Sequence, residues 1–235
     1  MGHAWTLSQR EYARHEARRG RRFAFETVSP RATALVVVDM VPFFADQNPF
    51  CRAAIAPINA LAAALRAAGG AVAWVLPAPE PFEDLSVAFN GAQGAAAYRR
   101  SGGEGPLPDR LCPGLASARE DLFTEKRAAS AFFPGRCDLH LRLAAREIDT
   151  LIVTGTVTNV CVESTVRDAR TLGYRVIVVA DACAARTDAE HNAALHTIYR
   201  SFGDVRPTDE VLALIGGAGF PPNAEGLSPS ADEEG

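Results

Sequence analysis

A cysteine stands where a buried strand gives way to a helix. In the stretch GTVTNVCVESTVRDA, residues 155–169, an apolar run precedes Gly155 and a helical pattern follows Asn159, so Cys161 falls in the first helical turn. The thiolate is the reactive form of cysteine, and the free N–H groups and dipole at a helix start favour negative charge. The position predicts a nucleophilic thiol beside unpaired N–H donors.

Two more reactive side chains stand at the ends of predicted strands. Asp39 lies at the end of the run ALVVVDM, and Lys126 closes the run DLFTEK. In open parallel sheets, ligands bind beyond the carboxyl ends of the strands. Taken alone, each residue has a plainer explanation: a helix cap for Asp39, a surface ion pair for Lys126 and a structural thiol for Cys161. Together they predict a carboxylate, an ammonium and a thiol that converge at one edge of the sheet.

This trio suits the hydrolysis of an amide. The carboxylate accepts the thiol proton and later returns it to the leaving amine. The ammonium helps to keep the thiolate charged. Backbone N–H groups of residues 157–161 would hold the oxyanion of a tetrahedral intermediate.

The elements that must position these side chains alternate along the chain. Five short, apolar, β-branched runs predict buried parallel strands at residues 34–40, 71–77, 121–126, 150–155 and 175–181, with a sixth short strand at 203–205. Helices are predicted at residues 55–68, 137–147, 160–172 and 188–201. The alternation predicts an α/β, three-layer, doubly wound Rossmann-like fold with a mainly parallel sheet of about six strands.

The chain divides into three parts by composition. Residues 1–28 are rich in arginine and predict a solvated N-terminal arm, residues 29–218 form the single α/β domain, and residues 219–235 predict a flexible tail. Within the domain, residues 93–113 are loaded with glycine and proline. This segment predicts a long surface excursion that acts as a lid or as a subunit contact.

Composition excludes several classes of protein. The chain has 235 residues, 48% of them hydrophobic, with a formal net charge of −4, so we expect no nucleic-acid partner. We expect no membrane partner, because there is no apolar run of eighteen residues and no signal-peptide core at the start. The five cysteines are scattered without a CxxC pair, which indicates neither a disulfide frame nor a zinc site and favours the reducing cytoplasm.

The three motifs together resemble a known family. LVVVDM, EKRAASAF and VTGTVTNVCVESTVRDA are similar to the segments that carry the acidic residue, the lysine and the nucleophile of the isochorismatase-like cysteine hydrolases. That family includes N-carbamoylsarcosine amidohydrolase, ureidoacrylate and biuret hydrolases, nicotinamidase and streptothricin hydrolase. The resemblance covers about residues 34–205 and implies that Asp39, Lys126 and Cys161 form the catalytic triad.

The resemblance also implies details of the nucleophile loop. The oxyanion hole would use the N–H groups of Thr158 and Cys161, and a non-proline cis peptide would join Val157 to Thr158. One departure concerns the segment after the aspartate, where the family commonly has Gln-Asn-Asp-Phe. Here VPFF stands instead, so Val41 and Pro42 replace the amides.

Aromatic residues predict a fairly apolar pocket. The candidate substrate-binding residues are four aromatic side chains near the proposed triad: Phe44, Trp74, Phe132 and Phe133. Core packing is the plainer role for about half of such side chains.

Histidines argue against a metal of the nicotinamidase type. The family members that use a metal carry histidines after the second strand, but this chain has none between His15 and His140. His191 and His196, on the last long predicted helix, are expected at the surface or at an interface. We therefore expect no metal and no cofactor.

Four functions compete on these observations. The leading one is a metal-independent cysteine hydrolase that cleaves a C–N bond (amide, ureido or lactam) of a small-molecule substrate through a covalent acyl-enzyme, in a homodimer or homotetramer. The alternative is an isochorismatase-type vinyl-ether hydrolase that uses Asp39 as acid and does not need the cysteine. A non-catalytic domain is disfavoured by the intact trio, and a nucleotide-binding Rossmann enzyme by the lack of G-x-G-x-x-G after the first strand.

Overall fold

The computed structural model describes residues 2–79 and 81–217. A single sheet of six strands lies at its centre, in the order β3-β2-β1-β4-β5-β6. Every neighbouring pair in it is parallel. The strands are β1 (Thr33–Val38), β2 (Ala71–Pro77), β3 (Leu122–Lys126), β4 (Thr150–Thr156), β5 (Arg175–Ala184) and β6 (Asp204–Arg206). The predicted fold class and the predicted parallel sheet are confirmed.

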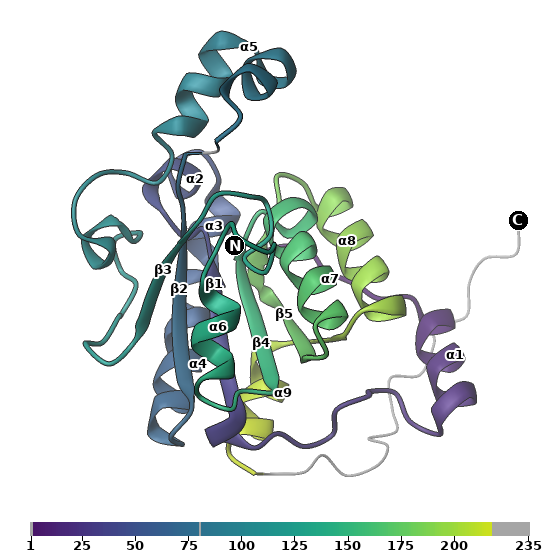
Figure 1. The fold of residues 1–235 in the computed structure, drawn as a ribbon. Coiled ribbons are helices and arrows are strands. Elements are labelled where there is room, and N and C mark those ends of the chain that lie inside the picture. Colours follow the sequence, from purple (N-terminus) through teal and green to yellow (C-terminus); the bar gives the residue numbers. More distant parts are fainter. Residues whose placement is uncertain (1, 80, 218–235) are drawn as a thin grey trace, which may run out of the picture.

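Helices cover both faces of the sheet (Figure 1). One face carries α6 (Leu139–Ala144), α7 (Glu163–Thr171) and α8 (Asp188–Ser201), and the other carries α4 (Ile55–Ala67) and α9 (Thr208–Ile215). The central strands β1 and β4 are buried at every position, because both of their faces are covered. This arrangement gives two apolar cores, one on each side of the sheet.

Some boundaries differ from the predicted ones. β5 continues to Ala184, and the helix predicted from residue 160 begins earlier, with a π-helical turn η3 (Thr158–Val162) that leads into α7. The helix predicted over residues 137–147 is reduced to α6. The short helix α9 was not predicted; its Val211 and Leu214 pack into the core beside α4.

The N-terminal arm is not simply solvated. It contains the helix α1 (Gln9–Arg19), in which Glu11 and His15 are buried. Tyr12 packs edge to face on Tyr199 of α8, with ring centroids 5.2 Å apart. Packing against α8 orders the arm despite its many arginines. The tail predicted over residues 219–235 lies outside the described residues.

The excursion predicted over residues 93–113 is partly helical. Its first part belongs to α5 (Glu83–Arg99), a helix with a kink at Gly91, whose φ of 72° interrupts the helical backbone. A short 3-10 turn, η2 (Leu107–Arg110), follows. α5 stands beyond the carboxyl ends of the strands and away from the body of the domain (Figure 1). Its alanines account for the helix, because alanine favours helix more than any other residue does.

By length and composition alone, one run within the described residues, Pro49–Ala67, could cross a membrane. It joins the short helix α3 (Pro49–Ala53) to α4. Its apolar residues Ile58, Leu61 and Leu65 are fully buried and belong to the core on one face of the sheet. In all, 33% of the run is buried.

Candidate active site

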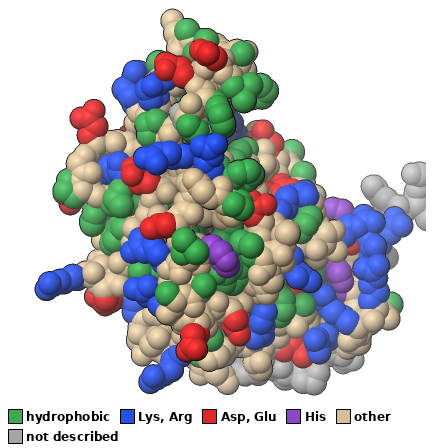
Figure 2. Space-filling model, in the orientation of Figure 1, with side chains coloured by type: hydrophobic (Ala, Val, Ile, Leu, Met, Phe, Trp, Pro, Cys, Tyr) green, Lys and Arg blue, Asp and Glu red, His purple; other side chains and the backbone are tan. Residues whose placement is uncertain are grey.

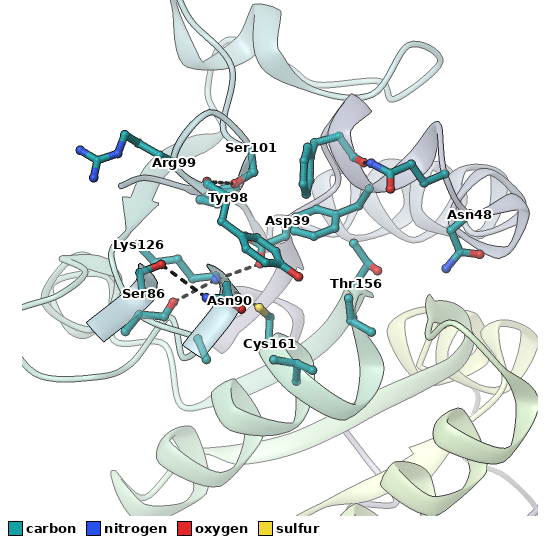
Figure 3. Close-up of a pocket in the computed structure, with 18 of the residues that line it drawn as sticks. Asp39, Asn48, Ser86, Asn90, Tyr98, Arg99, Ser101, Lys126, Thr156 and Cys161 are labelled. Carbon is teal, nitrogen blue, oxygen red and sulfur yellow. Dashed lines mark hydrogen bonds and ion pairs between the residues drawn. The ribbon is translucent and has the colours of Figure 1, made fainter. Parts of the chain in front are cut away.

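The three side chains of the predicted triad meet at the carboxyl edge of the sheet (Figure 3). Asp39 follows β1, Lys126 is the last residue of β3, and Cys161 lies in the turn η3. The Lys126 Nζ atom lies 2.8 Å from Asp39 Oδ2 and 3.4 Å from Cys161 Sγ. It also donates a hydrogen bond to the carbonyl of Ala128, at 3.0 Å. The ammonium therefore lies between the carboxylate and the thiol.

Parallel register explains why residues so distant in sequence come together. Val38, just before Asp39, pairs with Val75 of β2 and with Gly155 of β4. On the far side of β2, Pro77 pairs with Lys126. The long lysine side chain spans the width of β2 to reach Asp39. Asp39 has a φ of 54°, a left-handed conformation that aspartate tolerates better than most residues.

Gly155 allows the strands to approach closely beneath the site. Its φ is +113°, and a Cβ atom added there would lie 2.1 Å from the carbonyl oxygen of Val38. The pairing of β4 with β5 also shifts its register between Val153 and Gly155. Only glycine fits this position without moving the backbone.

The buried ion pair is held by mutual attraction. Burial lowers the pKa of Lys126, but the adjacent Asp39 and Cys161 raise it, and the net shift is upward. Burial raises the pKa of Asp39, and the neighbouring ammonium of Lys126 opposes that shift. Within the described residues, the Asp39 Oδ1 atom has no hydrogen-bond partner. The carboxylate thus keeps an oxygen that is able to accept a proton.

The protonation state of Cys161 in the free protein differs from the expected one. Burial and then the charge of Asp39 raise the pKa of the Cys161 thiol, Lys126 lowers it, and the net pKa is about 12. We expected a thiolate from the helix start and from the ammonium. The protonated thiol prevails because desolvation and the carboxylate outweigh both effects.

The cis peptide of the nucleophile loop lies one residue earlier than predicted. It joins Thr156 to Val157, not Val157 to Thr158. The Val157 carbonyl already accepts hydrogen bonds from the N–H groups of Val160 and Val162, at 3.0 and 3.2 Å. Val157 is therefore the N-cap residue of the turn η3.

The predicted oxyanion donors lie in this turn, Thr158 as its first residue and Cys161 as its fourth. Among the described residues, the N–H groups of Thr158 and Cys161 have no hydrogen-bond acceptor outside their own turn. Thr158 is fully buried, and its Oγ1 atom lies 2.9 Å from Nδ1 of His191. His191 is also fully buried, which corrects the prediction that it lies at the surface or at an interface. His196 does reach the surface, on α8.

A histidine from the N-terminus completes the support behind this loop. His3 stacks between Phe50 and His191, with ring centroids 3.8 and 4.2 Å apart. Its Nδ1 atom lies 2.6 Å from Asp188 Oδ1, and its Nε2 atom accepts a hydrogen bond from the Ala185 N–H at 3.0 Å. This role of His3 could not be predicted, because no local motif links it to residues near position 190.

A cavity of about 1070 Å³ opens above the triad. Of the four aromatic residues predicted to bind substrate, only Phe44 lines it. Trp74 is fully buried under the sheet and donates a hydrogen bond to Asp121. Phe132 is buried against Tyr174, and Phe133 is 51% exposed elsewhere on the surface. These three side chains do not line the cavity, which contradicts their predicted role in substrate binding.

Several other lining residues were not predicted individually, although Tyr98 lies in the excursion predicted to be a lid or a subunit contact. They belong to α3, to α5 and to the segment that precedes α8: Phe50, Leu85, Phe89, Tyr98 and Arg186. Figure 3 shows Tyr98 projecting into the cavity that Cys161 and Asp39 also line. Among residues 2–79 and 81–217, no group of three or more His, Cys, Asp or Glu side chains is arranged to hold a metal ion.

A doubly wound parallel sheet with an aspartate, a lysine and a cysteine at its carboxyl edge defines the class of this protein. Residues 33–210 match the isochorismatase domain, so the chain belongs to the isochorismatase family. Among solved structures it is similar to a cysteine hydrolase from Pseudomonas syringae pv. phaseolicola, with a TM-score of 0.69 and 29% identity, over 83% of this chain and 97% of that one.

Curated relatives include amidohydrolases. The chain is 32% identical to ureidoacrylate amidohydrolase RutB of Klebsiella pneumoniae, over 75% of this chain and 84% of that protein. It is 40% identical to N-carbamoylsarcosine amidase of Arthrobacter, but over only 46% of this chain and 39% of the amidase. With the isochorismatase family protein YwoC of Bacillus subtilis it shares 38% identity, over 48% of this chain and 61% of that protein. The chain thus spans less than two thirds of the length of several relatives it matches.

Proposed function

We propose that this protein is a metal-independent cysteine hydrolase that cleaves the C–N bond of an amide, ureido or lactam substrate through a covalent acyl-enzyme. The observation that carries the proposal is the position of Lys126 Nζ, 2.8 Å from Asp39 Oδ2 and 3.4 Å from Cys161 Sγ. All three residues line the large cavity. The amidases among the relatives support the same class of reaction.

The first half of the reaction forms the acyl-enzyme. As Cys161 Sγ attacks the carbonyl carbon, its proton passes to Asp39, so a neutral thiol in the resting state is no obstacle. The C–S bond forms, and the carbonyl oxygen becomes an oxyanion that the N–H groups of Thr158 and Cys161 stabilise. When the intermediate collapses, the C–N bond breaks, and Asp39 returns the proton to the leaving nitrogen.

The second half releases the acid. Asp39 takes a proton from a water molecule, whose oxygen attacks the thioester carbonyl, and the C–S bond breaks as the thiol regains the proton. Lys126 acts throughout as a fixed positive charge. It stabilises the ionised Asp39 and the sulfur as negative charge develops there.

One observation favours a second candidate, the hydrolysis of a vinyl ether. Burial raises the pKa of Asp39, which suits a general acid that protonates a carbon atom of the substrate. In that reaction Asp39 is essential and Cys161 is not. The ammonium of Lys126 in contact with the carboxylate opposes this role, because it favours the ionised form.

The two reactions separate in one experiment. Wild type, Cys161→Ala and Asp39→Asn are assayed on amides, N-carbamoyl amino acids, lactams and isochorismate, with mass spectrometry of the Cys161 peptide. The cysteine mechanism predicts an acyl adduct on Cys161 and a loss of several orders of magnitude in both variants, since members of such a unit are not additive. Substantial turnover by Cys161→Ala would refute it and favour the vinyl-ether reaction.

A further inference from the structure

The outer wall of the cavity is formed by exposed apolar side chains. Leu85 and Phe89 of α5 line the cavity, and they are 67% and 87% exposed. Hydrophobic side chains are visible on the projecting upper part of the molecule, where Figure 1 places α5 (Figure 2). A cluster of large, solvent-exposed apolar side chains marks a site that a ligand or another protein surface covers. Their place on the cavity wall points to a ligand.

An aromatic surface links α5 to the body of the domain. Phe43 and Phe44, in the short helix α2 (Pro42–Ala45), contact each other edge to face, with centroids 5.0 Å apart. Phe43 in turn lies 5.9 Å from the ring of Tyr98 on α5. All three rings line the cavity that Cys161 lines. The apolar surface is therefore continuous from α2 to α5.

Several polar side chains of the wall are engaged within the protein. Asn48 donates to the carbonyl of Ala185 and accepts from the N–H of Phe50. Gln47 donates to the carbonyl of Phe43, and Arg99 forms an ion pair with Glu83. These groups lose hydrogen bonds if they turn toward a ligand, so they favour a ligand that makes few demands on them.

We propose that the cavity takes amide or ureido substrates that carry an aryl or branched alkyl group, and that α5 with α2 forms the wall that binds this group. The proposal deepens the function proposed above and rests on it. A cavity of about 1070 Å³ is large enough for such a group together with the reacting carbonyl. Covering Leu85 and Phe89 with the substrate removes their apolar surface from water, and this contributes to binding.

A substrate series measures the contribution of the wall. We expect kcat/KM to rise from acetamide to hexanamide and 3-phenylpropanamide, by up to about fourfold for each methylene group buried, which corresponds to about 0.8 kcal/mol. N-carbamoylphenylalanine should likewise exceed N-carbamoylglycine, which places the apolar group on the other side of the scissile bond. A flat or falling profile in both series would overturn the proposal.

Two variants on the same helix locate the effect. Phe89→Ser removes an apolar side chain that lines the cavity, whereas Val87→Ser removes one that is 38% exposed but does not line it. Phe89→Ser should lower kcat/KM for 3-phenylpropanamide at least about fivefold more than for acetamide. Val87→Ser should leave the ratio of the two substrates unchanged. An equal effect of both variants on both substrates would contradict a binding role for this wall.

A second copy of the chain is the competing occupant of α5. Light scattering of wild type and Phe89→Ser distinguishes the two cases, because a ligand wall predicts the same mass for both proteins. A smaller assembly in Phe89→Ser, with all substrates affected alike, would assign the surface to an interface and overturn the proposal.

A binding measurement distinguishes failure of the proposed function from failure of the proposed wall. If wild type cleaves no amide, calorimetry with Cys161→Ala still measures whether 3-phenylpropanamide binds more tightly than acetamide. Tighter binding that Phe89→Ser weakens would support the wall even so. Equal affinities would overturn it.

Discussion

The imidazole of His3 lies flat on the imidazole of His191, with ring centroids 4.2 Å apart and an angle of 13° between the rings. Burial and then the neighbouring His3 lower the pKa of His191, to about 3. His191 is therefore neutral at pH 7, and its Nδ1 contacts the hydroxyl of Thr158 at 2.9 Å. His3, near the N-terminus, and His191 of α8 thus meet behind the nucleophile loop.

The lowered pKa of His191 predicts a loss of stability in acid. Between the folded value of about 3 and the ordinary value of 6.5, the unfolded chain binds more protons, so the free energy of unfolding falls as the pH falls through that range. From pH 7 to pH 4 the contribution of His191 is about 3 kcal/mol. Urea unfolding at several pH values should show this slope, and His191→Gln should flatten it. An equally steep slope in His191→Gln would assign the acid sensitivity to other groups.

His3 should stabilise the segment that leads into α8. Because the Ala185 N–H donates to Nε2, Nδ1 carries the proton and donates to Asp188. His3→Ala removes both hydrogen bonds and the two stacked contacts, a loss of about 2 kcal/mol in the free energy of unfolding. Hydrogen exchange at the Ala185 amide should become faster. His196→Ala, a change at a histidine of α8 that contacts Glu11 of α1 at 3.5 Å, serves as the control and should leave exchange at the Ala185 amide unchanged.

The sequence was sufficient to predict the sheet and the meeting of three reactive side chains at its edge. Buried parallel strands leave continuous β-branched runs in the sequence, and their carboxyl ends must meet at one edge, so Asp39, Lys126 and Cys161 could be placed together. The thiol's protonation state could not be predicted, because it depends on desolvation. A helix start is visible in the sequence, but the burial of Cys161 is not.

The other predictions of the site failed where they depended on side-chain direction or on long-range contacts. Trp74 lies on a strand next to the site, but its side chain points into the core on one face of the sheet. His3 contacts residues more than 180 positions away, a separation at which no local pattern gives a signal. The wall residue Phe89 belongs to a helix outside the core, where apolar periodicity does not reveal a ligand.

Gly155 should be irreplaceable, although other glycines with positive φ should not be. Gly155→Ala places a Cβ atom 2.1 Å from the Val38 carbonyl and forces β1 and β4 apart, at an expected cost above about 4 kcal/mol. Gly173→Ala is the matched control, with a φ of +98° but nothing within 4 Å of its added Cβ, and should cost only about 1–2 kcal/mol. Thermal unfolding and soluble yield measure both. Similar losses in the two variants would show that conformation, not the close approach, makes glycine necessary.

The charges of Asp39 and Lys126 should shift the pKa of the Cys161 thiol in opposite directions. Because the pKa of Cys161 is raised, the thiol is protonated at neutral pH, and alkylation by iodoacetamide should become faster as the pH rises. Asp39→Asn removes a negative charge that raises this pKa. The alkylation profile should therefore shift to lower pH, by at least about one unit, even as turnover is lost.

The lysine is best tested where Asp39 is already neutral. In wild type, Lys126→Met would also change the ionisation of Asp39, because the two groups form an ion pair 2.8 Å apart. In the Asp39→Asn background that complication disappears, and adding Lys126→Met should raise the Cys161 pKa and slow alkylation at a given pH. Mass spectrometry of the Cys161 peptide separates this thiol from the other four cysteines, and circular dichroism checks the fold. Identical profiles for the single and the double variant would show that Lys126 does not stabilise negative charge on the sulfur.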